Sequence, residues 1–173
     1  MNTLYQRLAG ESISDALLRL EAEIKARPAD ADLRAAFVQF LILSGNWARA
    51  LTQLKSWLAL KPQAKPTVTL LEQAIQGEQQ RARVFAGEVR PAMPEAQLPW
   101  LTTLAQALTE SAGHAQTLRL AALEQAPASR GQVTLENEES HTFEWLMDGD
   151  ARLGPVCETL VNGRYFWVPF CAK

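Results

Sequence analysis

The sequence predicts a mainly α protein in which stacked helix hairpins are followed by a small C-terminal antiparallel β segment, an α+β arrangement. Two observations predict this fold. A shift of 34 residues superimposes the first third of the chain on itself, and near Gly131 the helical periodicity changes to the alternation typical of strands. We expect a helical domain over residues 1–128 and a β segment over residues 129–173.

The repeat rests on matching apolar, alanine and proline positions. Ile13, Ala16, Leu17, Leu20, Ile24 and Pro28 fall on Trp47, Ala50, Leu51, Leu54, Leu58 and Pro62. This is the tetratricopeptide period, in which a helix hairpin stacks on its neighbour to bury its apolar face. The match to the consensus is partial, because Arg34 and Val38 stand where Trp and Gly are expected. Arrays of this kind typically bind other proteins.

Capping and helix-breaking residues divide the first ninety residues into helices. The predicted helices cover residues 2–9, 12 or 14 to 27, 30 or 32 to 44, 47–60, and one long helix from Pro66 to about residue 85. Small Ala16 and Ala50 let helix backbones approach closely. Three prolines make residues 88–99 a connector, and a degenerate further hairpin follows over residues 100–126.

Four short runs rich in β-branched and aromatic residues predict the strands of one small antiparallel sheet. They cover residues 132–135, 142–146, 156–161 and 165–168. Asn162-Gly163 between the last two is a strong hairpin signal. An apolar face carrying Phe143, Trp145, Tyr165 and Trp167 needs a covering element, so the sheet looks unfinished.

Composition and charge exclude several classes of function. The net charge is −2, with 17 basic and 19 acidic residues spread along the chain, so nucleic acid is not an expected partner. Apolar runs fall far short of the roughly 18 residues of a membrane span, and the N-terminus lacks the pattern of a signal peptide. We expect a cytoplasmic protein with no membrane contact, in which Cys157 and Cys171 are partly buried apolar side chains.

Candidate catalytic and metal-binding groups are weak. Asp148, Asp150 and Glu158 resemble a metal site or an acid–base pair, but Asp-Gly-Asp is first of all turn chemistry, and we expect Asp148, Asp150 and Arg152 to form a structural loop. His114 and His141 lack metal-ligand spacing. Nucleophile-elbow and phosphate-loop motifs are absent from the sequence, so no catalytic residue, cofactor or metal is predicted.

Partner contacts are predicted from exposed cations and from tryptophans, which are frequent at interaction hot spots. The predicted partner-binding residues are Arg34, Trp57, Arg81, Arg83 and Trp167. Trp47, Trp100 and Trp145 are expected in the core. The expected recognition is helix-in-groove capture on the hairpins, or alternatively addition of a partner strand to the open sheet edge.

Two strings near the C-terminus are specific. Residues 143–155 read FEWLMDGDARLGP and residues 163–170 read GRYFWVPF. Together with GNWARA at residues 45–50 and RARVFAGEVRP at residues 81–91, they resemble the ImpE/TagJ (SciE) family of type VI secretion clusters. Members of that family usually continue beyond the second string, so we expect either a shortened natural form or a trimmed chain.

The resemblance implies a non-enzymatic accessory adaptor that binds the small sheath subunit (TssB) and is linked to the ClpV disassembly ATPase. Two alternatives stay open from the residues alone. One is a generic tetratricopeptide-like chaperone or scaffold for another client, and the other is an enzyme with a site in the β segment. No oligomeric state is predicted.

Overall fold

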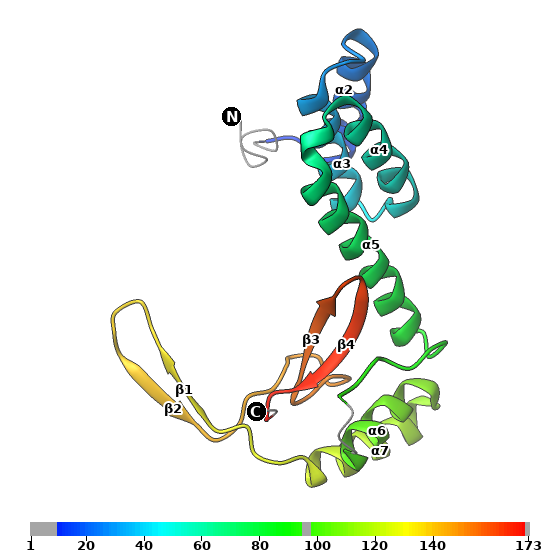
Figure 1. Ribbon diagram of the computed structural model, residues 1–173. Coiled ribbons are helices and arrows are strands. Elements are labelled where there is room, and N and C mark those ends of the chain that lie inside the picture. The colour runs from blue at the N-terminus through cyan, green and yellow to red at the C-terminus, as the bar shows by residue number, and fades with distance from the viewer. Residues whose placement is uncertain (1–9, 95–97, 172–173) are drawn as a thin grey trace. The chain divides into compact units, whose positions relative to one another are not determined.

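The structure, a computed structural model, describes residues 10–94 and 98–171, and it is mainly α with small antiparallel strand pairs toward the C-terminus (Figure 1), which confirms the predicted fold class. The predicted helix over residues 2–9 lies outside the described residues. Contacts divide the chain into two compact units, residues 1–75 and 76–173. No helix in the described ranges is both long and apolar enough to cross a bilayer.

The first unit consists of antiparallel helices with clear capping signals. Its elements are α2 (Ile13–Ala26), α3 (Ala31–Leu43), α4 (Trp47–Leu60), the 3-10 turn η1 (Pro62–Ala64) and the start of α5 (Lys65–Phe85). The N-cap of α2 is Ser12, whose side chain accepts the Asp15 N–H. The N-cap of α3 is Asp30, whose side chain accepts two N–H groups of that helix. Gly45 takes a φ of 72° after α3, a conformation that glycine adopts without strain.

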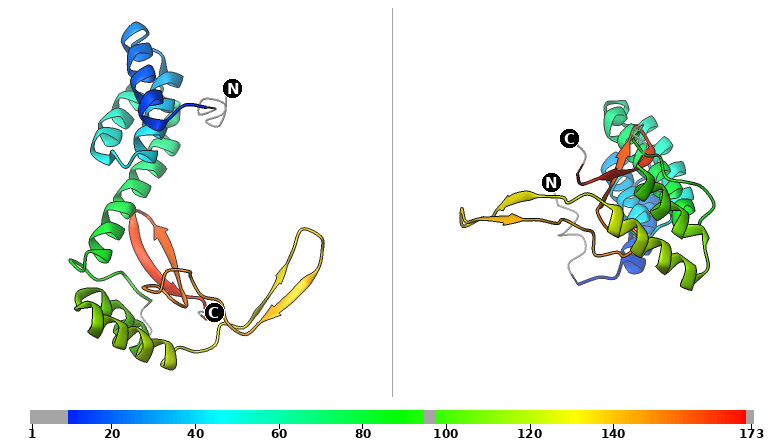
Figure 2. Two further views of the ribbon diagram at one scale, coloured as in Figure 1. Left: turned by 180° about the vertical axis from the view of Figure 1, so that it is seen from behind. Right: turned by 90° about the horizontal axis from the view of Figure 1, so that it is seen from below.

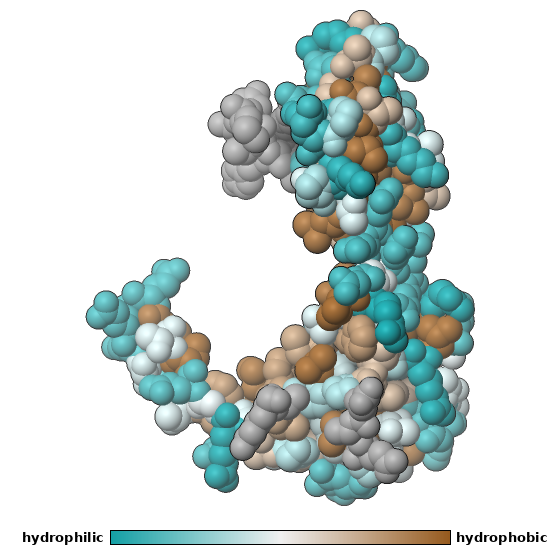
Figure 3. Space-filling model, in the orientation of Figure 1, coloured by the Kyte–Doolittle hydropathy of each residue, from teal (hydrophilic) through white to brown (hydrophobic). Residues whose placement is uncertain are grey.

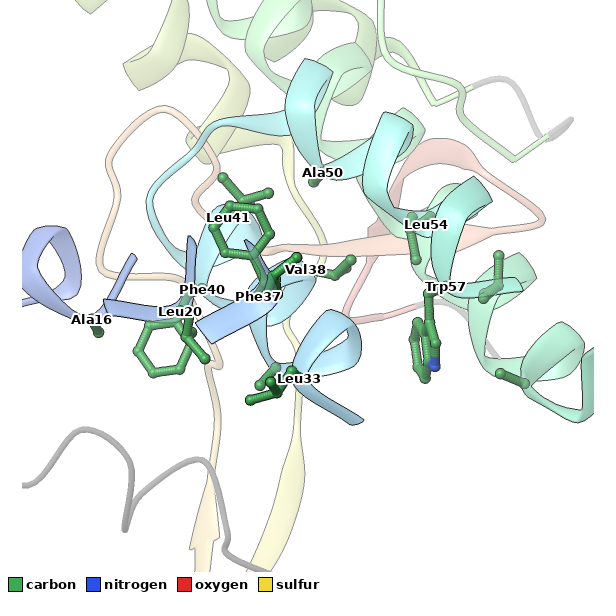
Figure 4. Packing of buried hydrophobic residues seen from close by; sticks show 14 of the residues in the cluster. Ala16, Leu20, Leu33, Phe37, Val38, Phe40, Leu41, Ala50, Leu54 and Trp57 are labelled. Carbon is green, nitrogen blue, oxygen red and sulfur yellow. The ribbon is translucent and has the colours of Figure 1, made fainter. Parts of the chain in front are cut away.

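One apolar core holds this unit together (Figure 4), and α3 packs against both α2 and α4. Ala16 of α2 and Ala50 of α4 are completely buried, so any larger side chain at either position would have to displace its neighbours. The core continues along α5 through Val68 and Ile75. The matching alanine and leucine positions of the repeat, Ala16 with Leu20 and Ala50 with Leu54, are therefore fully buried in this core, and the other apolar repeat positions pack against it or belong to it.

The second unit combines the end of α5 with two helices and two strand pairs. Its further elements are α6 (Pro99–Gln106), the 3-10 turn η2 (Ala107–Thr109), α7 (Ala112–Gln125), β1 (Gly131–Thr134), β2 (Ser140–Phe143), β3 (Val156–Val161) and β4 (Arg164–Pro169). The prediction of one sheet is wrong, because β1–β2 and β3–β4 form separate two-stranded sheets. The second strand also stops at Phe143, where the chain bends at Glu144 and enters a loop.

The β3–β4 hairpin has the turn that Asn162-Gly163 predicts. Asn162 and Gly163 both have positive φ, 51° and 75°, as a type I′ turn requires. The register pairs Val156 with Pro169 and Val161 with Arg164. The other side of β4 is occupied by the connector after α5, because the Trp167 N–H donates to the Ala92 carbonyl at 2.8 Å and Ala92 donates to the Tyr165 carbonyl at 3.2 Å.

A second apolar core covers β3–β4. Tyr165 and Trp167 are buried together with Val84 of α5, Trp100 of α6 and Ala122 of α7. The helices of the same unit therefore supply the covering layer for these two aromatic residues, and the expectation that their face is unfinished is wrong. The expectation of a core position is also wrong for Trp145, which lies in the loop after β2 and is 48% exposed.

Candidate functional site

A chain of hydrogen bonds joins α5 to the β3–β4 hairpin. The Arg81 guanidinium donates to both oxygens of Glu158, from Nε at 2.6 Å and from Nη2 at 3.1 Å. The Tyr165 hydroxyl donates to Glu158 Oε1, and the Trp167 indole donates to the Tyr165 hydroxyl at 2.8 Å. Four side chains from one helix and two strands therefore form one network.

Burial and hydrogen bonds in this network set the protonation states of Glu158 and Tyr165. Burial acts to raise the pKa of Glu158, but the hydrogen bonds from Arg81 and Tyr165 outweigh it, and the pKa stays below its ordinary value. Burial, followed by the hydrogen bond to the Glu158 carboxylate, raises the pKa of Tyr165. Glu158 is therefore ionised and Tyr165 protonated at neutral pH, a pairing suited to holding the strands rather than to exchanging protons.

The loop after β2 is tied to the same end of α5. Arg81 and Arg152 stack on the Phe85 ring, with guanidinium carbons 4.7 Å and 4.3 Å from its centre. Arg152 in turn pairs with Asp150 at 2.6 Å. An aromatic ring of the helix therefore anchors one arginine from the helix itself and one from the loop.

Asp148 and Asp150 organise the backbone of this loop. Asp150 Oδ1 accepts the Arg152 N–H at 2.9 Å, and Asp148 Oδ1 accepts the Asp150 N–H at 2.7 Å. The Asp148 N–H donates to the Gly154 carbonyl at 2.8 Å, which closes the loop. The side-chain hydrogen bond from Arg152, with its backbone N–H second, lowers the pKa of Asp150 to about 2.

The acidic and cysteine side chains of this region lie apart from one another. Within the described ranges, no group of three His, Cys, Asp or Glu side chains lies close enough to hold a metal ion. Cys157 is exposed, contrary to the expectation that it is partly buried, because β3 turns it away from the core side of the hairpin. The specific strings of the sequence thus supply the residues of a structural network.

The structure places the predicted partner-binding residues in different environments. Trp57 and Trp167 belong to the two cores, with 7% and 0% of their surfaces exposed, and Arg81 is engaged by Glu158. Arg34 lies in the first unit and donates to Gln53 Oε1 at 2.7 Å. Only Arg81 and Trp167 of these residues are brought into one network.

Arg83 has the most open position of the predicted cations. Its side chain is 59% exposed and pairs with Glu88 at 3.2 Å. It lines a shallow hollow of about 390 Å³ whose other walls are polar glutamines and one valine: Gln76, Gln79, Gln80 and Val89. A partner side chain could reach Arg83 there without disturbing either core.

Sequence reasoning missed a set of exposed apolar side chains. Large apolar side chains are exposed on β1, just after it, and in the loop after β2. They are Val133, Leu135, Trp145, Leu146 and Met147. The alternation of Val133 and Leu135 with Gln132 and Thr134 carried the signal, but alternation alone does not tell whether the apolar face is covered.

Comparisons with known proteins agree with the sequence strings. The family described as ImpE protein matches residues 140–172. The type VI secretion system accessory component TagJ of Pseudomonas aeruginosa is 40% identical over 161 residues, which cover 91% of this chain and 56% of that protein. The predicted resemblance to the ImpE/TagJ family is confirmed.

A solved structure has a similar fold. The crystal structure of protein VPA1032 from Vibrio parahaemolyticus matches with a TM-score of 0.79 and 25% sequence identity, and the match covers 97% of this chain and 63% of that one. The chain therefore spans less than two thirds of the length of either of these proteins.

Proposed function

We propose that this chain is a non-enzymatic accessory adaptor of a bacterial type VI secretion system and acts in the cytoplasm. The observation that carries the proposal is the 40% identity to TagJ across 91% of the chain. Stacked helix hairpins agree with this role, because such repeats generally serve as surfaces for other proteins.

The proposed clients are the small sheath subunit, similar to TssB, and the ClpV disassembly ATPase. An amphipathic helix of the client would lie on the helix hairpins, or an extended segment would add to a strand edge. Preformed repeats lose little conformational freedom when they bind, which favours capture of a short client segment.

Among the residues predicted from the sequence, Arg83 and Arg34 are the proposed direct contacts. Arg83 lines an open polar hollow, and Arg34 is partly exposed beside Gln53. Trp57 and Trp167 act indirectly, because they are buried and set the shape of the two cores. Arg81 likewise holds β3 in place through Glu158.

The test is capture of purified small sheath subunit and purified ClpV by the immobilised chain. We expect the wild-type chain to retain the sheath subunit, and Arg83→Glu to weaken retention at least about fivefold, as loss of one charged contact does. Arg119→Glu is the control, because it reverses the same charge at a partly exposed position on α7, outside the helix hairpins proposed for the client.

Absence of binding to both proteins at high micromolar concentration would sink the proposal. Retention of an unrelated client under the same conditions would favour the alternative of a general tetratricopeptide-like scaffold. Equal binding by both charge-reversal variants would remove Arg83 from the contact while leaving the adaptor role intact.

A further inference from the structure

The β1–β2 hairpin is amphipathic. Its register pairs Val133 with His141 and Gly131 with Phe143, while Gln132 pairs with Thr142. Because side chains alternate between the faces of a strand, Val133 and Phe143 share one face, and Gln132 and Thr142 share the other. The second face is polar throughout, since Thr134 and Ser140 are hydrogen-bonded across it at 3.0 Å.

The apolar face is exposed to solvent. Val133 is 46% exposed and Leu135 is 45% exposed, and the Leu135 N–H extends the ladder by donating to the Glu139 carbonyl at 2.9 Å. At the base of the hairpin the face is partly covered, because the Phe143 ring lies where a side chain at Gly131 would project. In the space-filling view, apolar surface lies among hydrophilic residues along the hairpin (Figure 3).

The backbone of the hairpin is also available. The sheet contains only β1 and β2, so among the described residues no third strand pairs with either outer edge. Both views show the hairpin extending away from α6, α7 and β3–β4 of the same unit (Figure 2). An isolated two-stranded hairpin is marginally stable in water, and a free edge next to an exposed apolar face is a template for strand addition.

Charge around the hairpin indicates what kind of segment fits. Three carboxylates, Glu136, Glu138 and Glu139, lie at the turn, and the Glu139 carboxylate is 3.9 Å from the His141 imidazole. Arg130 at the base is already paired with Glu144 at 2.6 Å. No Lys or Arg in the described part of the chain forms an ion pair with the three turn carboxylates, so a partner carrying basic side chains complements them.

We propose that the β1–β2 hairpin is a docking element for an extended, basic segment of a partner protein. The segment adds as a third strand along a free edge, places apolar side chains beside Val133 and Leu135, and presents Lys or Arg to the carboxylates at the turn. This surface is additional to the helix hairpins, and the inference holds whichever protein is the client. A second copy of the chain complements the turn poorly, because it brings the same carboxylates.

The first experiment varies the ligand and leaves the protein intact. The probe is a fluorescein-labelled decapeptide in which Val alternates with Lys and Thr, and its binding to the full chain is followed by fluorescence anisotropy. We expect saturation below about 1 mM, at least about tenfold weaker binding when Glu replaces Lys, and a similar loss when alternate peptide nitrogens are methylated. Salt should weaken binding of the Lys peptide.

The second experiment varies the hairpin. Val133→Thr with Leu135→Thr keeps strand-forming residues but removes the apolar face, and we expect at least about tenfold weaker binding. Gln132→Ser with Thr134→Ser changes the opposite face of the same strand. The affinity of this variant for the Lys peptide should stay within about twofold of the wild-type value. Glu136→Gln with Glu138→Gln should weaken binding of the Lys peptide, whereas Glu110→Gln with Glu124→Gln, exposed carboxylates on another part of the unit, should not.

Three results overturn the inference. One is no saturable binding of the Lys peptide, and another is binding that is indifferent to backbone methylation or to the choice of face. The third is self-association of the chain, seen by sedimentation, that Val133→Thr with Leu135→Thr abolishes, because the face then belongs to a second copy. None of these results bears on capture of the sheath subunit through the helix hairpins.

Discussion

At the scale of single residues, the motif Asp-Gly-Asp-Ala-Arg acts through charge-assisted hydrogen bonds. Asp150 accepts from both the side chain and the backbone of Arg152, and the same guanidinium covers the Phe85 ring. Fixing the loop in this way determines where Leu153 enters the second core. The ionised Asp150 carboxylate therefore stabilises the fold, and protonating it should lower the free energy of unfolding.

Asp150→Asn should lower the free energy of unfolding at neutral pH, because the amide cannot carry the charge that holds Arg152. The pKa of Asp150 is about 2 in the folded chain and 3.8 in the absence of interactions, so its stabilising effect is complete above about pH 4 and is lost as the pH falls toward 2. The Asp150 side chain is 30% exposed and the Arg152 side chain 47% exposed. Solvent screening therefore reduces the stabilisation from this pair to about 1 kcal/mol. Urea unfolding between pH 2 and 7 measures it.

The control for this measurement is Asp32→Asn, since Asp32 is 81% exposed and contacts Lys61 at 3.3 Å. We expect Asp150→Asn to be less stable than wild type at pH 7 and to converge with it near pH 2. An Asn variant whose stability keeps the full acid dependence of the wild type would show that another carboxylate is responsible.

At the scale of elements, the contact of α5 with β3 explains an unfavourable residue in a long helix. Gly77 lies inside α5, where glycine costs roughly 1 kcal/mol relative to alanine. The Leu160 side chain of β3 occupies the space in which a side chain at position 77 would stand. The helix thus gives up intrinsic stability for close packing of the hairpin.

A double-mutant cycle tests this explanation. Gly77→Ala alone should change the free energy of unfolding by less than about 0.5 kcal/mol, because the gain in helix propensity is offset by displacing the tip of Leu160. In a Leu160→Ala background, the same substitution should stabilise by about 1 kcal/mol. Gly113→Ala on α7 is the control, since nothing lies within 4 Å of its added carbon.

The interpretation fails if Gly77→Ala stabilises equally in both backgrounds, because coupling between the two positions is then absent. Thermal and urea unfolding of the four proteins in the cycle give the coupling energy directly. Leu160 is 40% exposed, so its removal leaves the second core intact and keeps the comparison clean.

Local signals predicted the elements well. Ser12, Asp30 and Gly45 delimit helices at the expected residues, and Asn162-Gly163 forms the expected turn. These features depend on residues a few positions apart, so the sequence displays them directly. The long α5 was likewise predicted from its apolar stripe and Pro66.

Long-range pairings were not predictable in the same way. Arg81 and Glu158 are 77 residues apart in sequence, and nothing local shows that they meet. The cover over Tyr165 and Trp167 comes from three helices, so the strand pattern alone made this face look unfinished. Trp145 was expected inside because the predicted strand over residues 142–146 put it on the apolar face, but the chain leaves the strand one residue earlier, at Glu144.

At the scale of the whole molecule, the two apolar cores found among residues 10–94 and 98–171 share no buried residue. The first includes Leu20, Phe40 and Ile75, and the second includes Val84, Leu104 and Trp167. The helix α5 contributes to both cores. Its residues up to Ile75 belong to the first unit, and its residues from Gln76 onward belong to the second. Separate cores favour separate opening reactions, because the stability of each unit is set by its own burial.

Native-state hydrogen exchange distinguishes the two units. Leu20→Ala creates a cavity in the first core and should cost about 2–5 kcal/mol there, so amides of α2 to α4 lose protection. Amides of α6, α7, β3 and β4 should keep theirs, and Leu104→Ala should give the opposite pattern. Since Leu20 and Leu104 are both almost completely buried, the two substitutions are matched in kind. If either substitution lowers the protection of amides in both units equally, the chain unfolds as one cooperative body. Opening of one unit would then be coupled to opening of the other.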